Sequence, residues 1–247
     1  MKSFLLYLCF SLAGLGLVVS CGGGNQPAGA SDSTRPAQSA PAAAAGGSGD
    51  AAASAAGRPR IVAFGDSLTA GLGLPAHQSY PALLEERLRR DGYSYEVVNA
   101  GVSGDTSTGG LSRIDWALAE GDVRFVILEL GANDILRGQS VSQMKKNLAQ
   151  LIDKAQARGA RVILAGMYAP TSNGVIYQRE VAEAFRSLAA EQEVTLMPFF
   201  LEGVAGQANL NLEDGIHPNP EGTRIVAENV YKVLKPLLEE KRAATMK

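Results

Sequence analysis

The sequence has little cysteine and no excess of either charge, and both shortages limit its chemistry. The only cysteines, Cys9 and Cys21, lie within the first 21 of 247 residues. The rest of the chain therefore has no thiol for a disulfide, a thiolate metal site or a cysteine nucleophile. The formal net charge is -2, and no block of lysine or arginine stands out. The electrostatic pattern of a nucleic-acid-binding protein is missing, so we expect no nucleic-acid partner.

Residues 1–20 have the layout of a signal peptide. A lysine near the start precedes an apolar stretch over residues 4–19, somewhat short for a membrane-spanning helix of roughly 20 residues. The stretch ends in Val-Val-Ser-Cys21, which resembles the lipobox of bacterial lipoproteins. That resemblance implies cleavage before Cys21 and lipidation of Cys21, which would anchor the exported chain on the periplasmic side of the cell envelope. Gly22, where inner-membrane retention uses aspartate, favours the outer membrane. A plain signal peptide or an uncleaved anchor is the alternative.

Residues 21–59 are rich in glycine, alanine, serine and proline and contain no aromatic residue. This composition predicts a disordered tether between the membrane and a globular part. The Gly-Gly-Ser-Gly run at residues 46–49 lacks the Gly-Lys-Ser/Thr ending of a phosphate-binding loop. We therefore expect one catalytic domain over residues 60–247, with neither a cofactor nor a metal.

After Arg60, short apolar runs alternate with longer amphipathic segments. This alternation predicts parallel strands that are covered on both faces by helices. In such folds a ligand binds outside the carboxyl ends of the strands. The predicted strands are 61–64, 95–98, 125–130, 162–166 and 194–198, and the predicted helices are 80–90, 111–119, 141–157, 178–191 and 221–238.

Three loops after predicted strands contain candidate site residues. Ser67, in Gly-Asp-Ser-Leu, follows the first strand and is a candidate nucleophile, although serine is also a common helix N-cap. Gly104 follows the second strand and has a backbone N–H that can bind an oxyanion, or it simply forms a tight turn. Asn133 follows the third strand, where its amide is either an oxyanion donor or ordinary turn chemistry.

Asp214 and His217 are the strongest candidate pair, in Asp-Gly-Ile-His-Pro before the last predicted helix. A carboxylate three residues before an imidazole can fix its tautomer and stabilise its protonated form. A structural alternative is that both residues cap the helix. The chain's other histidine, His77, has no carboxylate at similar spacing, and we interpret it as a surface residue.

In this order, the four blocks containing Ser67, Gly104, Asn133 and Asp214–His217 resemble those of the GDSL or SGNH hydrolase family, especially its bacterial arylesterase, thioesterase I and lysophospholipase L1 subgroup. The resemblance covers roughly residues 60–236. It implies a flavodoxin-like α/β/α sandwich with a five-stranded parallel sheet. One departure is Ala132, where the subgroup often has a second glycine. The Gly-x-Ser-x-Gly elbow of α/β-hydrolases is absent.

The resemblance also implies a role for each candidate. Ser67 would attack an acyl carbonyl, His217 would remove the serine proton and Asp214 would orient the imidazole. The N–H groups of Ser67 and Gly104 and the Asn133 side chain would bind the oxyanion.

The substrate is less well defined than the chemistry. Leu136 and residues 167–170 follow strand ends and either line an acyl groove or belong to the core. The favoured function is a monomeric hydrolase of acyl esters, including aryl esters, lysophospholipids and acyl thioesters. An O-acetyl esterase acting on envelope polysaccharide or peptidoglycan is the alternative, and a non-catalytic envelope lipoprotein is a third.

Overall fold

The structure is a computed structural model, and it describes residues 57–245. The predicted signal peptide at residues 1–20, Cys21 and nearly all of the tether predicted for residues 21–59 lie outside the described residues. No helix within the described part of the chain is both long and apolar enough to cross a membrane.

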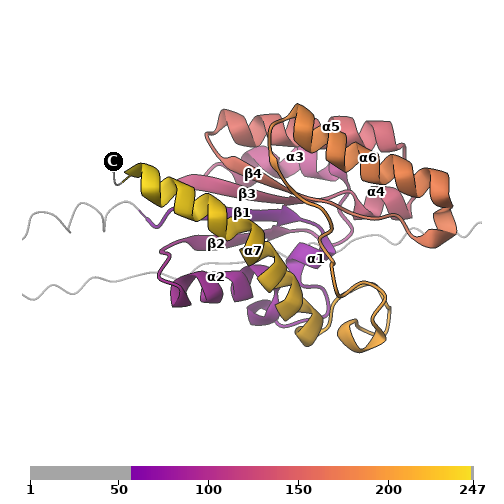
Figure 1. Cartoon of the computed structure of the whole chain (residues 1–247), viewed down its shortest axis with the longest axis horizontal. Helices are drawn as coiled ribbons and strands as arrows, with labels where there is room; N and C mark the ends of the chain where they lie inside the picture. The colour runs from indigo at the N-terminus through magenta and orange to yellow at the C-terminus, as the bar shows by residue number, and fades with distance from the viewer. Residues whose placement is uncertain (1–56, 246–247) are drawn as a thin grey trace, which may run out of the picture. The chain divides into compact units, whose positions relative to one another are not determined.

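Five parallel strands form one sheet in the order β2-β1-β3-β4-β5, which confirms the predicted five-stranded parallel sheet. The three central strands are almost wholly buried because helices cover both of their faces (Figure 1). The strands are β1 (Arg60–Gly65), β2 (Glu96–Gly101), β3 (Val123–Glu129), β4 (Arg161–Ala165) and β5 (Thr195–Met197).

The long helices form a layer on each side of the sheet. Helices α2 and α7 pack against each other on one face, and α3, α5 and α6 pack side by side on the other (Figure 1). The predicted three-layer α/β/α sandwich is therefore confirmed. The long helices are α2 (Tyr80–Arg90), α3 (Ser107–Ala117), α5 (Val141–Ala157), α6 (Val175–Glu191) and α7 (Pro220–Thr245). Short helical segments are α1 (Ser67–Ala70), α4 (Ala132–Leu136) and 3₁₀ turns at Ala76–Gln78, Thr171–Asn173 and Ala208–Leu210.

Three helices differ in extent from the sequence prediction, and the smallest difference is in α6, which begins at Val175 and not at residue 178. Helix α3 begins at Ser107, not at residue 111, because the Thr106 hydroxyl accepts a hydrogen bond from the Gly109 N–H and caps the helix across two glycines. Helix α7 continues through Pro236 to Thr245. Pro236 removes one backbone hydrogen bond at an exposed position, and Leu234 and Leu237 on either side of it in the sequence remain buried.

Gly101, the last residue of β2, allows α1 to lie directly against the end of the sheet. A Cβ atom on Gly101 would lie 2.2 Å from the Ala70 backbone nitrogen and 2.7 Å from its Cα. Both contacts are with backbone atoms, which cannot turn aside as a flexible side chain can. The absence of a side chain at Gly101 therefore determines where α1 and its first residue, Ser67, are positioned.

We expect Gly101→Ala to destabilise the protein by about 1–3 kcal/mol or more, because the added methyl group overpacks the contact between β2 and α1. Urea unfolding followed by circular dichroism measures the change. The control is Gly57→Ala, since no atom lies within 4 Å of a Cβ built at that glycine. An equal stability for Gly101→Ala and Gly57→Ala would contradict the prediction.

Candidate active site

Ser67 lies at the junction between β1 and the short helix α1. Asp66 caps this helix, and its carboxylate accepts a hydrogen bond from the Leu68 N–H at 3.0 Å. Ser67 is the first residue of α1, so its own N–H has no partner within the helix. The residue is 9% exposed. The structure therefore places a hydroxyl and an unused N–H together at the carboxyl edge of the sheet.

His217 lies in a tight loop between the 3₁₀ turn Ala208–Leu210 and α7. The loop is closed by a bridge between Asn211 and Pro218 and by a hydrogen bond of 2.7 Å from the Leu212 N–H to the His217 carbonyl. Within the loop, one oxygen of Asp214 accepts the N–H groups of Ile216 and His217 at 2.8 and 3.0 Å. The backbone of the loop thus fixes the carboxylate beside the imidazole.

Asp214, His217 and Ser67 form a continuous chain of hydrogen bonds. The second oxygen of Asp214 lies 2.6 Å from His217 Nδ1, and His217 Nε2 lies 2.8 Å from Ser67 Oγ. The backbone N–H groups of His217 and Ile216, together with the imidazole, lower the pKa of Asp214 to about 2. Asp214 is therefore ionised at neutral pH and can stabilise a protonated imidazole while His217 holds the serine proton.

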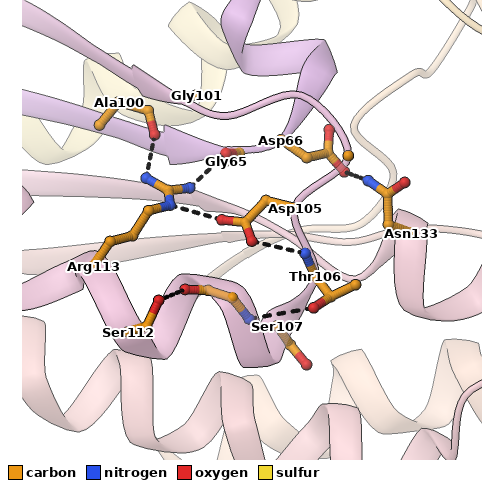
Figure 2. Close-up of polar contacts among 12 residues, drawn as sticks. Gly65, Asp66, Ala100, Gly101, Asp105, Thr106, Ser107, Ser112, Arg113 and Asn133 are labelled. Carbon is orange, nitrogen blue, oxygen red and sulfur yellow. Dashed lines mark hydrogen bonds and ion pairs between the residues drawn. The ribbon is translucent and has the colours of Figure 1, made fainter. Parts of the chain in front are cut away.

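Asn133 reaches the same region from α4, after β3. Its side-chain Nδ2 donates a hydrogen bond of 2.9 Å to Asp66, the residue before Ser67 (Figure 2). The next residue, Asp134, is buried and accepts the N–H and the hydroxyl of Ser107 at 2.8 and 2.6 Å. Asn133 therefore lies beside the Ser67 turn, while Asp134 attaches α4 to the start of α3.

Gly104 lies in the exposed loop between β2 and α3, in a left-handed conformation with φ of 80° that favours glycine. Its carbonyl accepts a hydrogen bond of 2.8 Å from the guanidinium of Arg137, just after α4. This contact links the Gly104 loop to the helix that bears Asn133.

Arg113 on α3 is a structural residue of the site that the sequence did not reveal. Its guanidinium donates hydrogen bonds to the carbonyls of Gly65 and Ala100 at 2.8 and 2.7 Å and pairs with Asp105 at 2.7 Å (Figure 2). It also lies over the Phe64 ring, 4.0 Å from the centroid. One cation thus joins the ends of β1 and β2 to the loop that contains Gly104, although nothing in the sequence distinguishes it from a surface arginine.

An apolar cavity of about 810 Å³ opens beside Ser67 and His217. The residues next to them, Leu68 and Ile216, line it. The stacked rings of Tyr168 and Phe199, with centroids 4.3 Å apart, form part of its wall. Leu136 and residues 167–170 all line this cavity, and Met167 and Ala169 also belong to the hydrophobic core, so the groove and the core interpretations both hold for these two.

The remaining candidates lie apart from this chemistry. His77 lies in the 3₁₀ turn Ala76–Gln78 and is exposed, which agrees with its interpretation as a surface residue. Within residues 57–245, no group of three or more histidine, cysteine, aspartate or glutamate side chains is placed to hold a metal ion.

Comparison with known proteins identifies the family of this chain. A model of the GDSL-like Lipase/Acylhydrolase family matches residues 63–225. Esterase TesA of Pseudomonas aeruginosa is 45% identical over 178 residues, which cover 72% of this chain and 89% of that protein. Thioesterase 1/protease 1/lysophospholipase L1 of Escherichia coli is 36% identical, with 74% and 87% covered. The crystal structure of AlinE4, an SGNH-hydrolase family esterase, is 39% identical, with a TM-score of 0.62 and 74% and 96% covered.

We expect Arg113→Met to destabilise the protein by about 1–3 kcal/mol, because two buried carbonyls and Asp105 lose a charged donor. We also expect a reduced kcat, because the turns at the ends of β1 and β2 lose their common support. Urea unfolding and ester hydrolysis measure the two effects. Arg124→Met is the matched control, since Arg124 is exposed and pairs with the exposed Asp122. Equal behaviour of the two variants would show that Arg113 has no positioning role.

Proposed function

Because the chain belongs to the GDSL-like lipase/acylhydrolase family and is a serine hydrolase that cleaves esters, we propose that Ser67, His217 and Asp214 are its catalytic triad. The observation that carries this proposal is the 2.8 Å contact between Ser67 Oγ and His217 Nε2, with Asp214 2.6 Å behind the imidazole. Ser67 attacks the acyl carbonyl as His217 takes its proton. His217 then protonates the leaving group. In the second half of the reaction, water attacks the acyl group on Ser67 as His217 takes a proton from the water, and His217 returns that proton to Ser67 Oγ as the carboxylic acid leaves.

In this proposal the oxyanion is bound by three donors, the N–H groups of Ser67 and Gly104 and the side chain of Asn133. The N–H of Ser67 has no hydrogen-bond partner within α1. Asn133 donates one of its two side-chain N–H hydrogens to Asp66, which leaves the other for the oxyanion. The hydrogen bond from Arg137 to the Gly104 carbonyl holds the loop that contains the Gly104 N–H near α4. Such preorganised donors stabilise negative charge as it develops on the substrate oxygen.

The acyl chain of the substrate would occupy the apolar cavity beside the triad. A volume of about 810 Å³ is far larger than an acetyl group needs. This supports aryl esters, lysophospholipids and acyl thioesters with longer acyl groups over the acetylated polysaccharides or peptidoglycan of the alternative function. The names of the relatives, esterase and thioesterase/lysophospholipase, fall within the same chemical range.

We further propose that the enzyme is monomeric and is anchored to the cell envelope through a lipid on Cys21, on the periplasmic side and in the outer membrane. The support for the anchor is the apolar stretch that ends in Val-Val-Ser-Cys21, followed by a long segment rich in glycine and alanine. A lipid-anchored enzyme meets its acyl substrates at the membrane surface, where lysophospholipids are concentrated.

Hydrolysis of p-nitrophenyl esters from acetyl to long chain tests the function. We expect kcat/KM to peak at medium or long chains. We expect Ser67→Ala to lower kcat by about four orders of magnitude or more, and Asn133→Ala by about 100- to 1,000-fold, the usual loss of one oxyanion donor. Ser112→Ala, on the exposed side of α3, should leave the rate unchanged. A maximum at acetyl would favour the O-acetyl esterase, and an inactive wild type would favour the non-catalytic lipoprotein.

Labelling of cells with radioactive palmitate tests the anchor. We expect the wild type and Cys9→Ala to take up label, because Cys9 lies within the removed peptide. Cys21→Ala should take up none, because no other cysteine remains after the cleavage point. Label on Cys21→Ala would contradict the lipoprotein interpretation.

A further inference from the structure

Glu129, the last residue of β3, is a fully buried carboxyl group that the proposed triad and oxyanion site leave unassigned. Its side chain is 0% exposed. Oε2 accepts hydrogen bonds from the Thr69 hydroxyl at 2.7 Å and from the Asp66 N–H at 3.2 Å. Oε1 is also buried and accepts no hydrogen bond. An ionised carboxylate in this position would keep one charged oxygen both desolvated and unpaired, which is strongly unfavourable.

A second buried carboxyl group, that of Asp66, is 1% exposed and belongs to the residue whose N–H donates to Glu129 Oε2 at 3.2 Å. Two carboxyl groups can share a hydrogen bond only when one of them is protonated. Within residues 57–245 no ion pair neutralises either group. The nearby cationic side chain of Arg113 pairs with Asp105, and His217 pairs with Asp214. The remaining titratable neighbour, Tyr80, is a buried phenol 3.5 Å from the Thr69 hydroxyl.

Each carboxyl group accepts two hydrogen bonds, but those of Asp66 reach both of its oxygens, whereas both donors to Glu129 bind Oε2 and leave Oε1 unpaired. Asp66 accepts hydrogen bonds from the Leu68 N–H at 3.0 Å and from Asn133 at 2.9 Å, and both stabilise its ionised form. Burial raises the pKa of Asp66 to about 6 and raises that of Glu129 well above its ordinary value, and the charge of Asp66 raises the latter further. Asp66 is therefore the anion of the pair at neutral pH.

We propose that Glu129 is a positioning residue, a protonated carboxylic acid that donates a hydrogen bond to Asp66 and thereby keeps Asp66 ionised as the acceptor for Asn133. An ionised Asp66 can only accept, so it binds the NH₂ end of the Asn133 amide and not its oxygen (Figure 2). The second amide hydrogen is then fixed in direction. The inference rests on the proposed oxyanion role of Asn133, because that hydrogen is the one offered to substrate.

Infrared spectroscopy of the purified full chain tests the protonation state directly. We expect the wild type at neutral pH to show the carbonyl stretch of a protonated carboxylic acid, and Glu129→Gln to lack it. Glu239→Gln, which replaces an exposed glutamate on α7, is the matched control and should keep the band. A band that is absent from the wild type, or that persists in Glu129→Gln, would overturn the proposal.

Ester hydrolysis by two variants tests the positioning role. Glu129→Gln keeps a neutral donor toward Asp66, so we expect its kcat to stay within about threefold of wild type. Glu129→Leu has no donor, and we expect its kcat to fall roughly tenfold or more with little change in KM, short of the 100- to 1,000-fold loss of a whole oxyanion donor. An unchanged kcat in Glu129→Leu would overturn the role.

If Glu129→Leu does not fold, the band and the kcat of Glu129→Gln decide the proposal. Absence of hydrolysis by the wild type would reject the proposed function, whereas the infrared band tests Glu129 independently.

Discussion

The hydrogen bond between the Ser67 hydroxyl and the His217 imidazole is the contact on which the proposed mechanism depends, and it joins segments separated by 150 positions. Each side reaches it by a different means. The parallel sheet delivers Ser67 to its carboxyl edge at the end of β1, and the loop closed by Asn211 and Pro218 presents His217 before α7. Any change that shifts the end of the sheet relative to this loop changes the distance between the two groups.

Burial of the polar groups around Ser67 lowers the free energy of unfolding, and the apolar core must offset this loss. Asp66, Glu129 and Asp134 are all buried, and each is stabilised by specific donors. Buried polar networks of this kind contribute little net stability, but they restrict the geometries that the surrounding loops can adopt. The apolar strands and helix faces supply stability, and the buried carboxyl groups and Arg113 determine the positions of the reacting groups.

Much of the fold and site follows from local patterns in the sequence. The β-branched runs around residues 61–64 and 125–130 predicted strands of the sheet. The short spacing between Asp214 and His217 predicted that a single turn brings the carboxylate to the imidazole. Arg113 could not be found in this way, because its partners on β1 and β2 are 48 and 13 residues away. Glu129 did leave a signal, a single acid in an apolar strand, but its meaning depends on Asp66, which only the folded sheet brings close.

Because Asp214 and His217 share one small loop, the contact of 2.8 Å between His217 and Ser67 is the one long-range contact that completes the proposed triad. During synthesis from the N-terminus, Ser67 and the first strands emerge long before that loop. In the proposed mechanism, the nascent chain therefore has its nucleophile but no base until residue 217 has been made. If the proposed triad is correct, partly made chains cannot hydrolyse esters by this mechanism.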